Sequence, residues 1–413
     1  MILRRTTVAV AATIILGGTL AACASSNGGT TSGDSATKVT AMVITDRTDP
    51  SGNSFAYPKN GEVAQAWADW TNAHGGINGR KVDLIICDAQ VNADKTADCA
   101  REAVQDHVAA VVASYAANSA VIEPILAPAK IPYMSSYPVA PSDYNEPIDF
   151  PTTSTPFILS GMGYIAGKLC KHPTLMSLQQ PSLQFNDQAI IAGVNAGGGK
   201  LVRTVVVPQQ VTDYAPLASQ AIQGSDCLIV YGGITMADSL YPALVQAGAT
   251  QRVIGLNSQT IGHPIDESNP KLTENGINVG IFPPYSSPVW STYKAMVVKY
   301  ASKQYDYQDF GAQLTYGGLV VFQHLIASMP KSTAVTAATV LAKLKSTTSL
   351  STGGLFPPFN FTKPYGVKGF TRLFDQSVTF SLVKNAAQGL EIALPGQPQF
   401  TPMGAAFAKG VTG

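Results

Sequence analysis

Aromatic, hydroxyl and amide side chains occur in loops that follow short apolar runs, which we interpret as strands. In an open parallel sheet, a ligand binds beyond the carboxyl ends of the strands. Hydroxyl and amide groups in these loops can hold a small polar molecule by hydrogen bonds. The candidate ligand-binding residues are Tyr57, Tyr115, Asn118, Ser119, Ser136, Tyr137, Phe185, Tyr231, Asn257 and Gln259.

Three of these candidates have a second interpretation. Ser119 precedes a helix predicted at 120–127, and serine is a common N-cap residue. Tyr137 could equally pack against its own loop, and Tyr57 could be a surface aromatic residue. The sequence leaves these alternatives open.

The common motifs of enzymes are not found. The sequence contains neither GxSxG nor HExxH, and its five histidines lack the spacing of a metal site. Residues 193–201 (GVNAGGGKL) superficially resemble a phosphate loop, but the glycine spacing differs and Leu201 stands where Ser or Thr would bind magnesium. We interpret this segment as a glycine turn at the end of a helix. The sequence therefore predicts no enzyme, no cofactor and no metal.

Two series of alternating strands and helices position the candidate residues. The predicted strands of the first series are 38–45, 82–87, 108–113 and 131–134, and those of the second are 174–178, 201–207, 227–231 and 252–256. Long helices are predicted at 289–304, 311–329 and 334–345, followed by strands at 369–374 and 377–383. The alternation predicts an α/β fold with two doubly wound parallel-sheet lobes joined by a hinge of crossing strands.

The first residues resemble a bacterial export signal. Arg4 and Arg5 precede a short apolar run, and residues 20–23 (LAAC) resemble a bacterial lipobox. We expect residues 1–22 to be a signal peptide and Cys23 to carry a lipid that anchors the protein to the cell membrane. Residues 23–37 are rich in Ser, Gly and Thr, which predicts a flexible tether. An ordinary signal with a chance cysteine is the alternative.

The remainder of the chain is close to neutral. The sequence has 27 basic and 26 acidic residues, and loss of Arg4 and Arg5 with the signal leaves a formal charge of −1. Nucleic-acid binding needs clustered Lys and Arg, so no nucleic-acid partner is expected. No further long apolar segment suggests a membrane span.

Several short motifs occur in a characteristic order. Residues 74–81 (HGGINGRK) end a predicted helix and begin a strand, and residues 131–136 (IPYMSS) form a strand end. Further matches occur at 87–94, 230–233, 354–361 and 368–370. Together these motifs resemble the branched-chain amino-acid-binding (leucine-binding) solute receptors of bacterial ABC importers, over nearly all of the chain after the tether. The resemblance implies the type I periplasmic-binding fold, a small-molecule solute, importer permease subunits as partners, a monomer and an extracytoplasmic location.

The resemblance also implies two lobes that close on the solute about a hinge. We expect crossings near 152–155, 282–284 and 357–359. Lobe 1 would comprise residues 38–155 and 283–356. Lobe 2 would comprise residues 156–282 and 357–400, with a C-terminal tail at 401–413.

The expected solute depends on one departure from this family. In relatives, helix amides after the loop that matches 114–119 hold a ligand carboxylate, and an acidic residue near Asn257 pairs with an ammonium group. Here Asn257 and Gln259 are neutral. A buried cation without a counter-charge is costly, so an amide or a small organic acid fits as well as an amino acid. A sensory receptor of the same fold, signalling to a membrane partner, is the alternative function.

Four cysteines lie in the part expected to be exported, where disulfides are permitted. We predict the pairs Cys87–Cys99 and Cys170–Cys227, because neither bond would then cross between the lobes and block closure. Four cysteines allow three pairings, and sequence alone does not choose among them.

Overall fold

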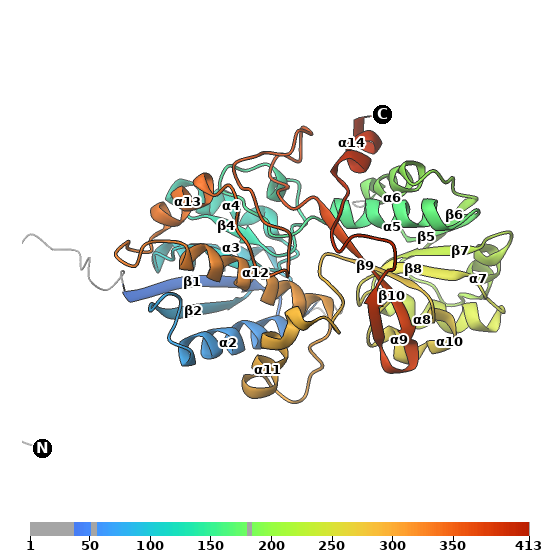
Figure 1. The fold of residues 1–413 in the computed structure, drawn as a ribbon, viewed down its shortest axis with the longest axis horizontal. Helices are drawn as coiled ribbons and strands as arrows, with labels where there is room; N and C mark the ends of the chain where they lie inside the picture. The colour runs from blue at the N-terminus through green and yellow to red at the C-terminus, as the bar shows by residue number, and fades with distance from the viewer. Residues whose placement is uncertain (1–36, 51–55, 180–183, 413) are drawn as a thin grey trace, which may run out of the picture.

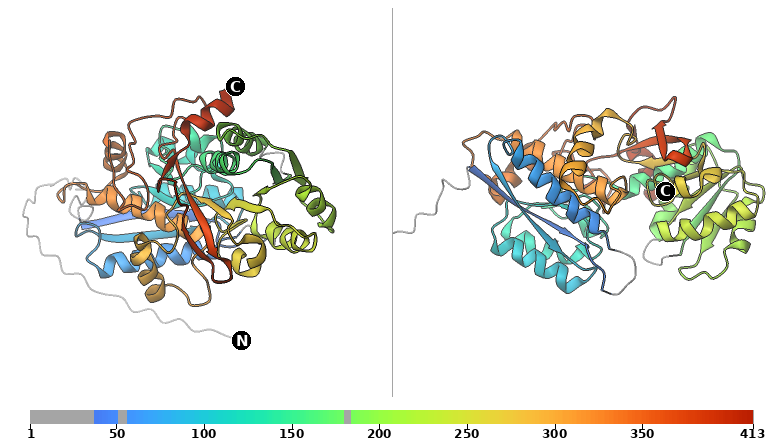
Figure 2. Two further views of the ribbon diagram at one scale, coloured as in Figure 1. Left: turned by 45° about the vertical axis from the view of Figure 1, so that its right-hand side comes forward. Right: turned by 90° about the horizontal axis from the view of Figure 1, so that it is seen from below.

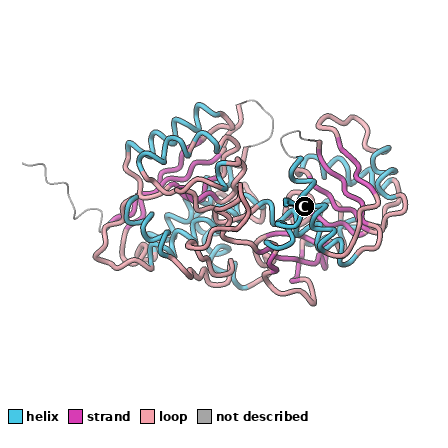
Figure 3. Tube along the Cα trace, turned by 90° about the horizontal axis from the view of Figure 1, so that it is seen from above, coloured by secondary structure: helices cyan, strands magenta, loops and turns pink. Residues whose placement is uncertain are grey.

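The computed structural model describes residues 37–50, 56–179 and 184–412. Within them the chain forms two α/β bodies that lie side by side, each built on its own sheet (Figure 1). We call the body with the four-stranded sheet lobe 1 and the body with the eight-stranded sheet lobe 2. Figure 3 shows the same division from above. The predicted signal, Cys23 and nearly all of the predicted tether lie outside the described residues.

Lobe 1 has a parallel sheet of strand order β2-β1-β3-β4. Its strands are β1 (Lys38–Thr45), β2 (Lys81–Asp88), β3 (Val111–Ser114) and β4 (Tyr133–Ser135). Alternate residues of β1 point to opposite faces, so Val43 packs in the core with α2 (Pro58–Ala73) and α12 (Phe310–Ala327), whereas Ile44 packs with α3 (Ala93–Gln105) and α4 (Glu123–Ala129). Both faces are covered, which explains why these strands are nearly continuous apolar runs. Helices α11 (Ser291–Tyr300) and α13 (Ala337–Ser346) pack beside α2 and α12.

Lobe 2 has a mixed sheet of order β11-β10-β9-β8-β7-β5-β6, with β12 paired to β10. Its parallel strands are β5 (Pro173–Leu178), β6 (Arg203–Val207), β7 (Cys227–Tyr231), β8 (Arg252–Leu256) and β9 (Ile277–Gly280). The antiparallel strands are β10 (Ser377–Asn385), β11 (Leu390–Ala393) and β12 (Thr401–Pro402). One face carries α5 (Thr155–Leu169) and α6 (Gln184–Ala196), and the other carries α7 (Ala215–Ile222) and α8 (Ile234–Gln246). Short helices α9 (Ile265–Ser268) and α10 (Pro270–Thr273) join β8 to β9.

The C-terminal segment packs on lobe 2. Residues 401–402, which the sequence assigns to a tail, form β12, and helix α14 (Gly404–Thr412) follows directly. Helix α14 contacts α5 and α6 (Figure 2). The buried side chains of Met403 and Phe407 attach this segment to the core.

Glycines allow α5 and α6 to approach closely. A Cβ atom on Gly163 would lie 1.9 Å from the Ile190 carbonyl oxygen, and one on Gly193 would lie 2.0 Å from the Ser160 carbonyl oxygen. Helix α6 ends at Ala196, and Gly198 then adopts a φ of +89°. The glycine-rich segment at 193–201 is therefore a helix contact and a helix end, which confirms the glycine-turn interpretation.

The strand predicted at 369–374 is wrong. The Arg372 N–H donates to the Tyr144 carbonyl (2.8 Å), and its Nε donates to the Asp149 carbonyl (2.7 Å). Its guanidinium lies 4.4 Å from the centre of the Phe150 ring. These contacts hold the segment against lobe 1, and strand β10 begins only at Ser377.

The structure contains disulfides Cys87–Cys99 and Cys170–Cys227, which is the pairing predicted from the sequence. Each joins segments of a single lobe, β2 to α3 in the first case and the end of α5 to β7 in the second. Among the described residues, no helix combines the length and the apolar character needed to cross a bilayer.

Candidate functional site

Four aromatic side chains meet at the carboxyl ends of the lobe 1 strands. The ring centroids of Tyr57 and Tyr115 are 4.6 Å apart, and those of Tyr115 and Tyr137 are 4.8 Å apart with an interplanar angle of 8°. Phe310 meets Tyr137 edge-on at 5.7 Å and 88°. We call Tyr57, Tyr115, Tyr137 and Phe310 the aromatic cluster. Stacked and edge-to-face pairs at these separations stabilise each other, so the four rings form one continuous cluster, in which Tyr115 and Phe310 are buried.

Each ring of the aromatic cluster comes from a different segment. Tyr57 is the N-cap residue of α2, Tyr115 follows β3, Tyr137 lies two residues beyond β4, and Phe310 begins α12. Tyr115 and Tyr137 meet because the ends of neighbouring parallel strands share one edge of the sheet. Asp309 fixes the position of Phe310, since its carboxylate accepts a hydrogen bond from the Ala312 N–H (2.9 Å) and caps α12.

Backbone bonds hold the loop after β3 in place. The Tyr115 N–H donates to the Ile44 carbonyl, and the Tyr115 carbonyl accepts from the Asp46 N–H, both at 3.1 Å. The buried Asp46 carboxylate accepts from the amides of Ala117 (2.7 Å) and Val91 (2.8 Å). Burial raises the pKa of Asp46, and these two amide bonds offset part of that rise. One amide of the loop expected to bind a carboxylate is therefore already occupied.

The helix after this loop starts differently from the prediction. It begins as a 3₁₀ helix, η1 (Ser119–Val121), and continues as the seven-residue α4. The N-cap position belongs to Asn118, which makes no side-chain capping bond, so the N-cap alternative for Ser119 is wrong. The buried Ser119 hydroxyl donates to Asp143 (2.8 Å).

Ser136 precedes Tyr137 and fixes the backbone on which that ring is carried. Its side chain is fully buried, and its hydroxyl lies 3.1 Å from the carbonyl oxygens of both Ala113 and Ser114. Ala113 adopts a φ of +50°, which is uncommon for a residue with a Cβ. The Ser136 hydroxyl thus ties the end of β4 to an unusual turn at the end of β3, one residue before Tyr137.

Lobe 2 contributes a second group of polar side chains. The Tyr231 hydroxyl, at the end of β7, accepts a hydrogen bond from Asn186 Nδ2 (2.6 Å). Asn186 is 8% exposed and lies on α6. Burial raises the pKa of Tyr231, so its hydroxyl stays protonated at neutral pH and can donate to a further acceptor. Phe185 lies in α6, but its side chain is outside the described part of the structure.

Tyr137 connects the two groups. Burial raises the pKa of its hydroxyl to about 12, and the neighbouring side chains of Thr155 and Gln259 partly offset this effect. Thr155 begins α5 and Gln259 follows β8, so both neighbours belong to lobe 2. Tyr137 also lies close enough to Tyr231 to contribute to the raised pKa of the Tyr231 hydroxyl. The predicted residues from the two lobes therefore converge on Tyr137.

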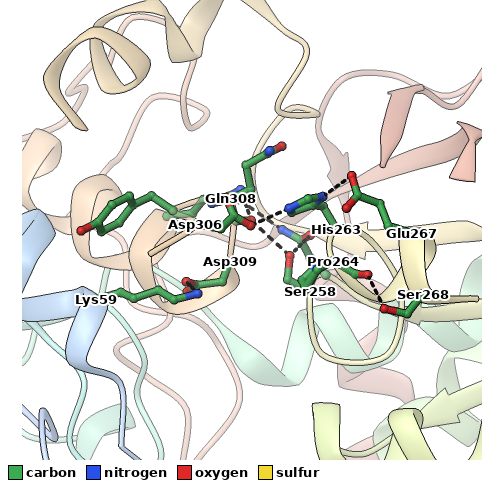
Figure 4. Close-up of polar contacts among 12 residues, drawn as sticks. Lys59, Ser258, His263, Pro264, Glu267, Ser268, Asp306, Gln308 and Asp309 are labelled. Carbon is green, nitrogen blue, oxygen red and sulfur yellow. Dashed lines mark hydrogen bonds and ion pairs between the residues drawn. The ribbon is translucent and has the colours of Figure 1, made fainter. Parts of the chain in front are cut away.

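The Asn257 side chain forms hydrogen bonds away from Tyr137, unlike Gln259, which lies beside Tyr137. Asn257 Nδ2 donates to Gln313 Oε1 of lobe 1 (3.2 Å), and Asn257 Oδ1 accepts from Asn278 Nδ2 (2.9 Å). Next to it, the Ser258 hydroxyl donates to the Gln308 carbonyl (3.3 Å). His263 completes this set, because its Nε2 lies 2.6 Å from Asp306 of lobe 1 while its Nδ1 lies 3.1 Å from Glu267 (Figure 4). We call the pairs Asn257–Gln313, Ser258–Gln308 and His263–Asp306 the interlobe contacts.

Acidic groups near the aromatic cluster are already paired. Asp309 forms an ion pair with Lys59 at 2.8 Å (Figure 4), and Asp46 accepts the two amides described above. No acidic residue occupies the positions of Asn257 and Gln259. Asp187 of α6 contributes to the raised pKa of Tyr231, and its carboxylate accepts a hydrogen bond from the Ser177 hydroxyl (2.5 Å). The arrangement thus offers rings, hydroxyls and amides to a solute, and the acidic groups named here already have hydrogen-bond or ion-pair partners.

The structure therefore brings together five of the ten predicted residues: Tyr57, Tyr115, Tyr137, Tyr231 and Gln259. Ser119, Ser136 and Asn257 instead bond to other protein groups. Sequence reasoning missed Phe310, Asn186 and Thr155. Phe310 follows an Asp that could have been identified as an N-cap, but the return of its helix to lobe 1 is a property of the tertiary fold. Asn186 is the neighbour in sequence of the predicted Phe185.

The comparisons with known proteins agree with this architecture. Residues 38–371 match the family model described as periplasmic binding protein. The chain therefore belongs to the periplasmic binding protein family, a family of solute-binding proteins whose location is extracytoplasmic. Comparison with curated proteins finds no match.

Solved structures show the same fold at low sequence identity. A leucine-binding protein from Thermotoga maritima has a TM-score of 0.62 at 18% identity, covering 86% of this chain and 97% of that one. A putative branched-chain amino acid ABC transporter protein from Rhodospirillum rubrum scores 0.65 at 18% identity, with coverage of 86% and 100%. A solute-binding protein from Rhodopseudomonas palustris, solved with 3,4-dihydroxybenzoic acid, scores 0.66 at 17% identity, with coverage of 89% and 99%. The predicted type I periplasmic-binding fold is thus confirmed.

Proposed function

We propose that the protein is the solute receptor of an ABC importer and that it captures a small polar solute between its lobes. The observation that carries this proposal is the convergence of ligand-competent side chains from both lobes on Tyr137: the aromatic cluster from lobe 1, and Gln259, Thr155 and Tyr231 from lobe 2. A solute that touches both groups favours closure, because only the closed arrangement allows all of its contacts at once.

The chemistry of the site favours a planar solute without an ammonium group. The parallel pair Tyr115–Tyr137 and the edge-on ring of Phe310 suit a flat group. Tyr231 and Asn186 suit an acceptor such as a carboxylate or amide oxygen. Of the predicted solute classes, small organic acids and amides therefore fit better than an α-amino acid. The relative solved with 3,4-dihydroxybenzoic acid supports the inclusion of aromatic acids in this class.

The solute class can be tested by a thermal-shift screen of the purified protein. The panel would include benzoate and hydroxybenzoates, nicotinamide, glutamine, leucine and a polyol. A ligand at one hundred times its dissociation constant adds about 2.7 kcal/mol to the free energy of unfolding. We expect a shift with an aromatic acid or amide, and we expect the compound to be recovered unchanged. A shift with leucine alone that is lost in the Tyr137→Ala variant would contradict the proposed class but not the receptor function.

The proposal includes attachment to the membrane through a lipid on Cys23, delivery to permease subunits, and action as a monomer. The leader sequence and the family support these points. Intact-mass analysis of the mature protein tests the anchor directly. A Cys23→Ser variant should lose the lipid mass and appear in the soluble fraction, and an unchanged distribution of this variant would contradict the anchor.

A further inference from the structure

A cavity of about 270 Å³ lies at the hinge, away from the side chains of the aromatic cluster. Its lining comes from both lobes and includes Asn278, Thr379, Ser381 and Glu391 of lobe 2 and Tyr285 and Lys294 of lobe 1. Neither Tyr231 nor any member of the aromatic cluster is part of the lining. Pockets for drug-sized ligands span about 300–1,000 Å³, so this cavity suits a smaller metabolite.

The lining contains one acidic residue, Glu391, and two basic ones, Lys294 and His263, of which His263 already pairs with Asp306 and Glu267. Glu391 Oε1 accepts a hydrogen bond from Asn278 Nδ2 (2.6 Å), and the Lys294 ammonium lies 4.4 Å from the centre of the Tyr285 ring. Among the described residues, neither Glu391 nor Lys294 forms an ion pair. Burial raises the pKa of Glu391 to about 8, and a ligand ammonium beside it would favour loss of its proton. The ionised Glu391 and Lys294 are together complementary to a ligand that carries both charge signs.

A polar group beside Glu391 lacks a partner. Asn278 is 3% exposed, and its Nδ2 donates hydrogen bonds to Glu391 and Asn257. Among the described residues, no donor forms a hydrogen bond with its Oδ1. A buried amide oxygen without a donor is unfavourable by about 1–3 kcal/mol. A ligand ammonium that donates to Asn278 Oδ1 and to the Glu391 carboxylate would satisfy both acceptors while their own hydrogen bond stays in place.

We propose that this hinge cavity is a second binding site, distinct from the aromatic cluster, and that it takes a small zwitterion with its ammonium toward Glu391 and its carboxylate toward Lys294. An occupant would touch both lobes, and the cavity lining includes all three lobe 2 residues of the interlobe contacts, Asn257, Ser258 and His263. Binding at the hinge and binding at the aromatic cluster would therefore be linked, and the effect of one ligand on the affinity of the other would be reciprocal.

Gly280 provides a variant that fills the cavity. A Cβ atom at this position would meet the Asn257 Cβ at 3.4 Å and Thr379 Oγ1 at 3.6 Å, which are ordinary contacts. Gly280→Val should therefore place methyl groups in the cavity while leaving the aromatic cluster in place. Lys294→Met removes the positive charge of a half-buried side chain on α11 and keeps its length. Glu391→Gln removes the negative charge and keeps a side-chain acceptor.

Isothermal titration of the purified protein with glycine, β-alanine and 4-aminobutyrate tests the proposal, because these carry the same two charges at increasing separation. Acetate and methylammonium are the single-charge controls. We expect at least one zwitterion to bind at least tenfold more tightly than either control. Lys294→Met and Glu391→Gln should each weaken this binding at least tenfold, and Gly280→Val should abolish it. Tyr137→Ala should change it less than threefold.

Three results would overturn the proposal. They are an absence of binding for all three zwitterions, binding that persists in the Lys294→Met variant, and binding that is lost in Tyr137→Ala. The last result would place the zwitterion at the aromatic cluster. If Gly280→Val fails to fold, as judged by circular dichroism, Lys294→Met decides alone. Failure of the hinge site leaves the receptor proposal unaffected, because that proposal is tested by the loss of solute affinity in Tyr137→Ala and Tyr231→Ala.

Discussion

Tyr115 and Tyr137 stack with their ring centroids 4.8 Å apart and their planes at 8°, although 22 positions separate them in the sequence. The stack exists because β3 and β4 are adjacent parallel strands, paired through Val111 with Tyr133 and Val112 with Met134, so their loops emerge at the same edge. It places the Tyr137 ring beside the Gln259 and Thr155 side chains of lobe 2, which both influence the pKa of its hydroxyl.

The first prediction concerns the residue that supports this stack. Ser136→Ala should lower the free energy of unfolding by about 1–3 kcal/mol, because the buried Ala113 carbonyl loses the Ser136 hydroxyl as a donor, whereas the Ser114 carbonyl keeps the Ser136 N–H (3.0 Å). The solute dissociation constant should change less than threefold, since the Ser136 hydroxyl bonds to backbone and not to a ligand. Urea unfolding and calorimetric titration measure the two effects. A large loss of affinity with unchanged stability would instead identify Ser136 as the ligand contact that the sequence suggested.

The second prediction concerns pH and the interlobe contacts. A hydrogen bond to Asp306 raises the pKa of His263 above its usual value, and Glu267 adds to the effect. A raised histidine pKa stabilises the folded state below the unfolded-state pKa of about 6.5, and this contribution is lost as the pH rises through the folded-state value. Because Asp306 is about 40% exposed, the contribution should be no more than about 1 kcal/mol.

Asp306→Asn provides the measurement. The parent protein should gain free energy of unfolding from the His263–Asp306 pair at pH 5.5 and not at pH 8.5. The variant should lack this gain, so its free energy of unfolding at pH 5.5 should fall relative to that at pH 8.5. Nuclear magnetic resonance titration of His263 should show a lower pKa in the variant. A variant with an unchanged His263 pKa would show that the interlobe ion pair does not form in solution.

The third prediction concerns Asp375, which is 5% exposed and precedes β10. Burial raises its pKa to about 7, and a hydrogen bond from the Ser377 N–H only partly offsets this rise. Between pH 3.8 and about 7 the folded state binds this proton more tightly than the unfolded state, so stability falls as the pH rises, by up to about 1.4 kcal/mol per unit. Asp375→Asn should remove this part of the slope, as measured by urea unfolding between pH 4.5 and 6.5. An identical slope in both proteins would contradict the raised pKa.

The fourth prediction compares the two disulfides. Their sequence separations are 57 residues for Cys170–Cys227 and 12 for Cys87–Cys99. In the chain-entropy description, loops of these lengths correspond to about 4 and about 3 kcal/mol of stabilisation. The double alanine variant at Cys170 and Cys227 should therefore lose more stability than the variant at Cys87 and Cys99. Both should bind the solute within twofold of the parent protein, and a tenfold change in either would show that the disulfides shape the site.

Much of the fold follows from local sequence signals. The motif at 74–81 predicted the end of a helix and the start of a strand. The structure has α2 ending at Ala73 and β2 beginning at Lys81, with positive φ at Gly75, Gly76 and Gly79. Glycine adopts that conformation without strain, so the signal is physical and local. The same holds for the glycine-rich end of α6.

The site was harder to predict because its members depend on long-range packing. Tyr115 and Tyr137 were selected by the rule for strand ends, which holds for any parallel sheet. Whether Asn257 or Gln259 turns toward Tyr137 depends on Gln313 and Asn278, which lie 56 and 21 positions away and take the Asn257 amide. The error at 369–374 has a similar origin, because Arg372 bonds to backbone more than 200 positions away. The pattern of apolar residues that predicts a strand contains no information about such distant hydrogen-bond partners.

The most direct test of the central claim is to titrate the best compound of the solute screen into the parent protein, Tyr137→Ala of lobe 1 and Tyr231→Ala of lobe 2. Capture between the lobes predicts one solute per chain, a loss of at least tenfold in affinity for each variant, and recovery of the compound unchanged. Binding that is impaired by the lobe 1 variant but unaffected by the lobe 2 variant, or conversion of the compound during the titration, would contradict a receptor that closes on its solute.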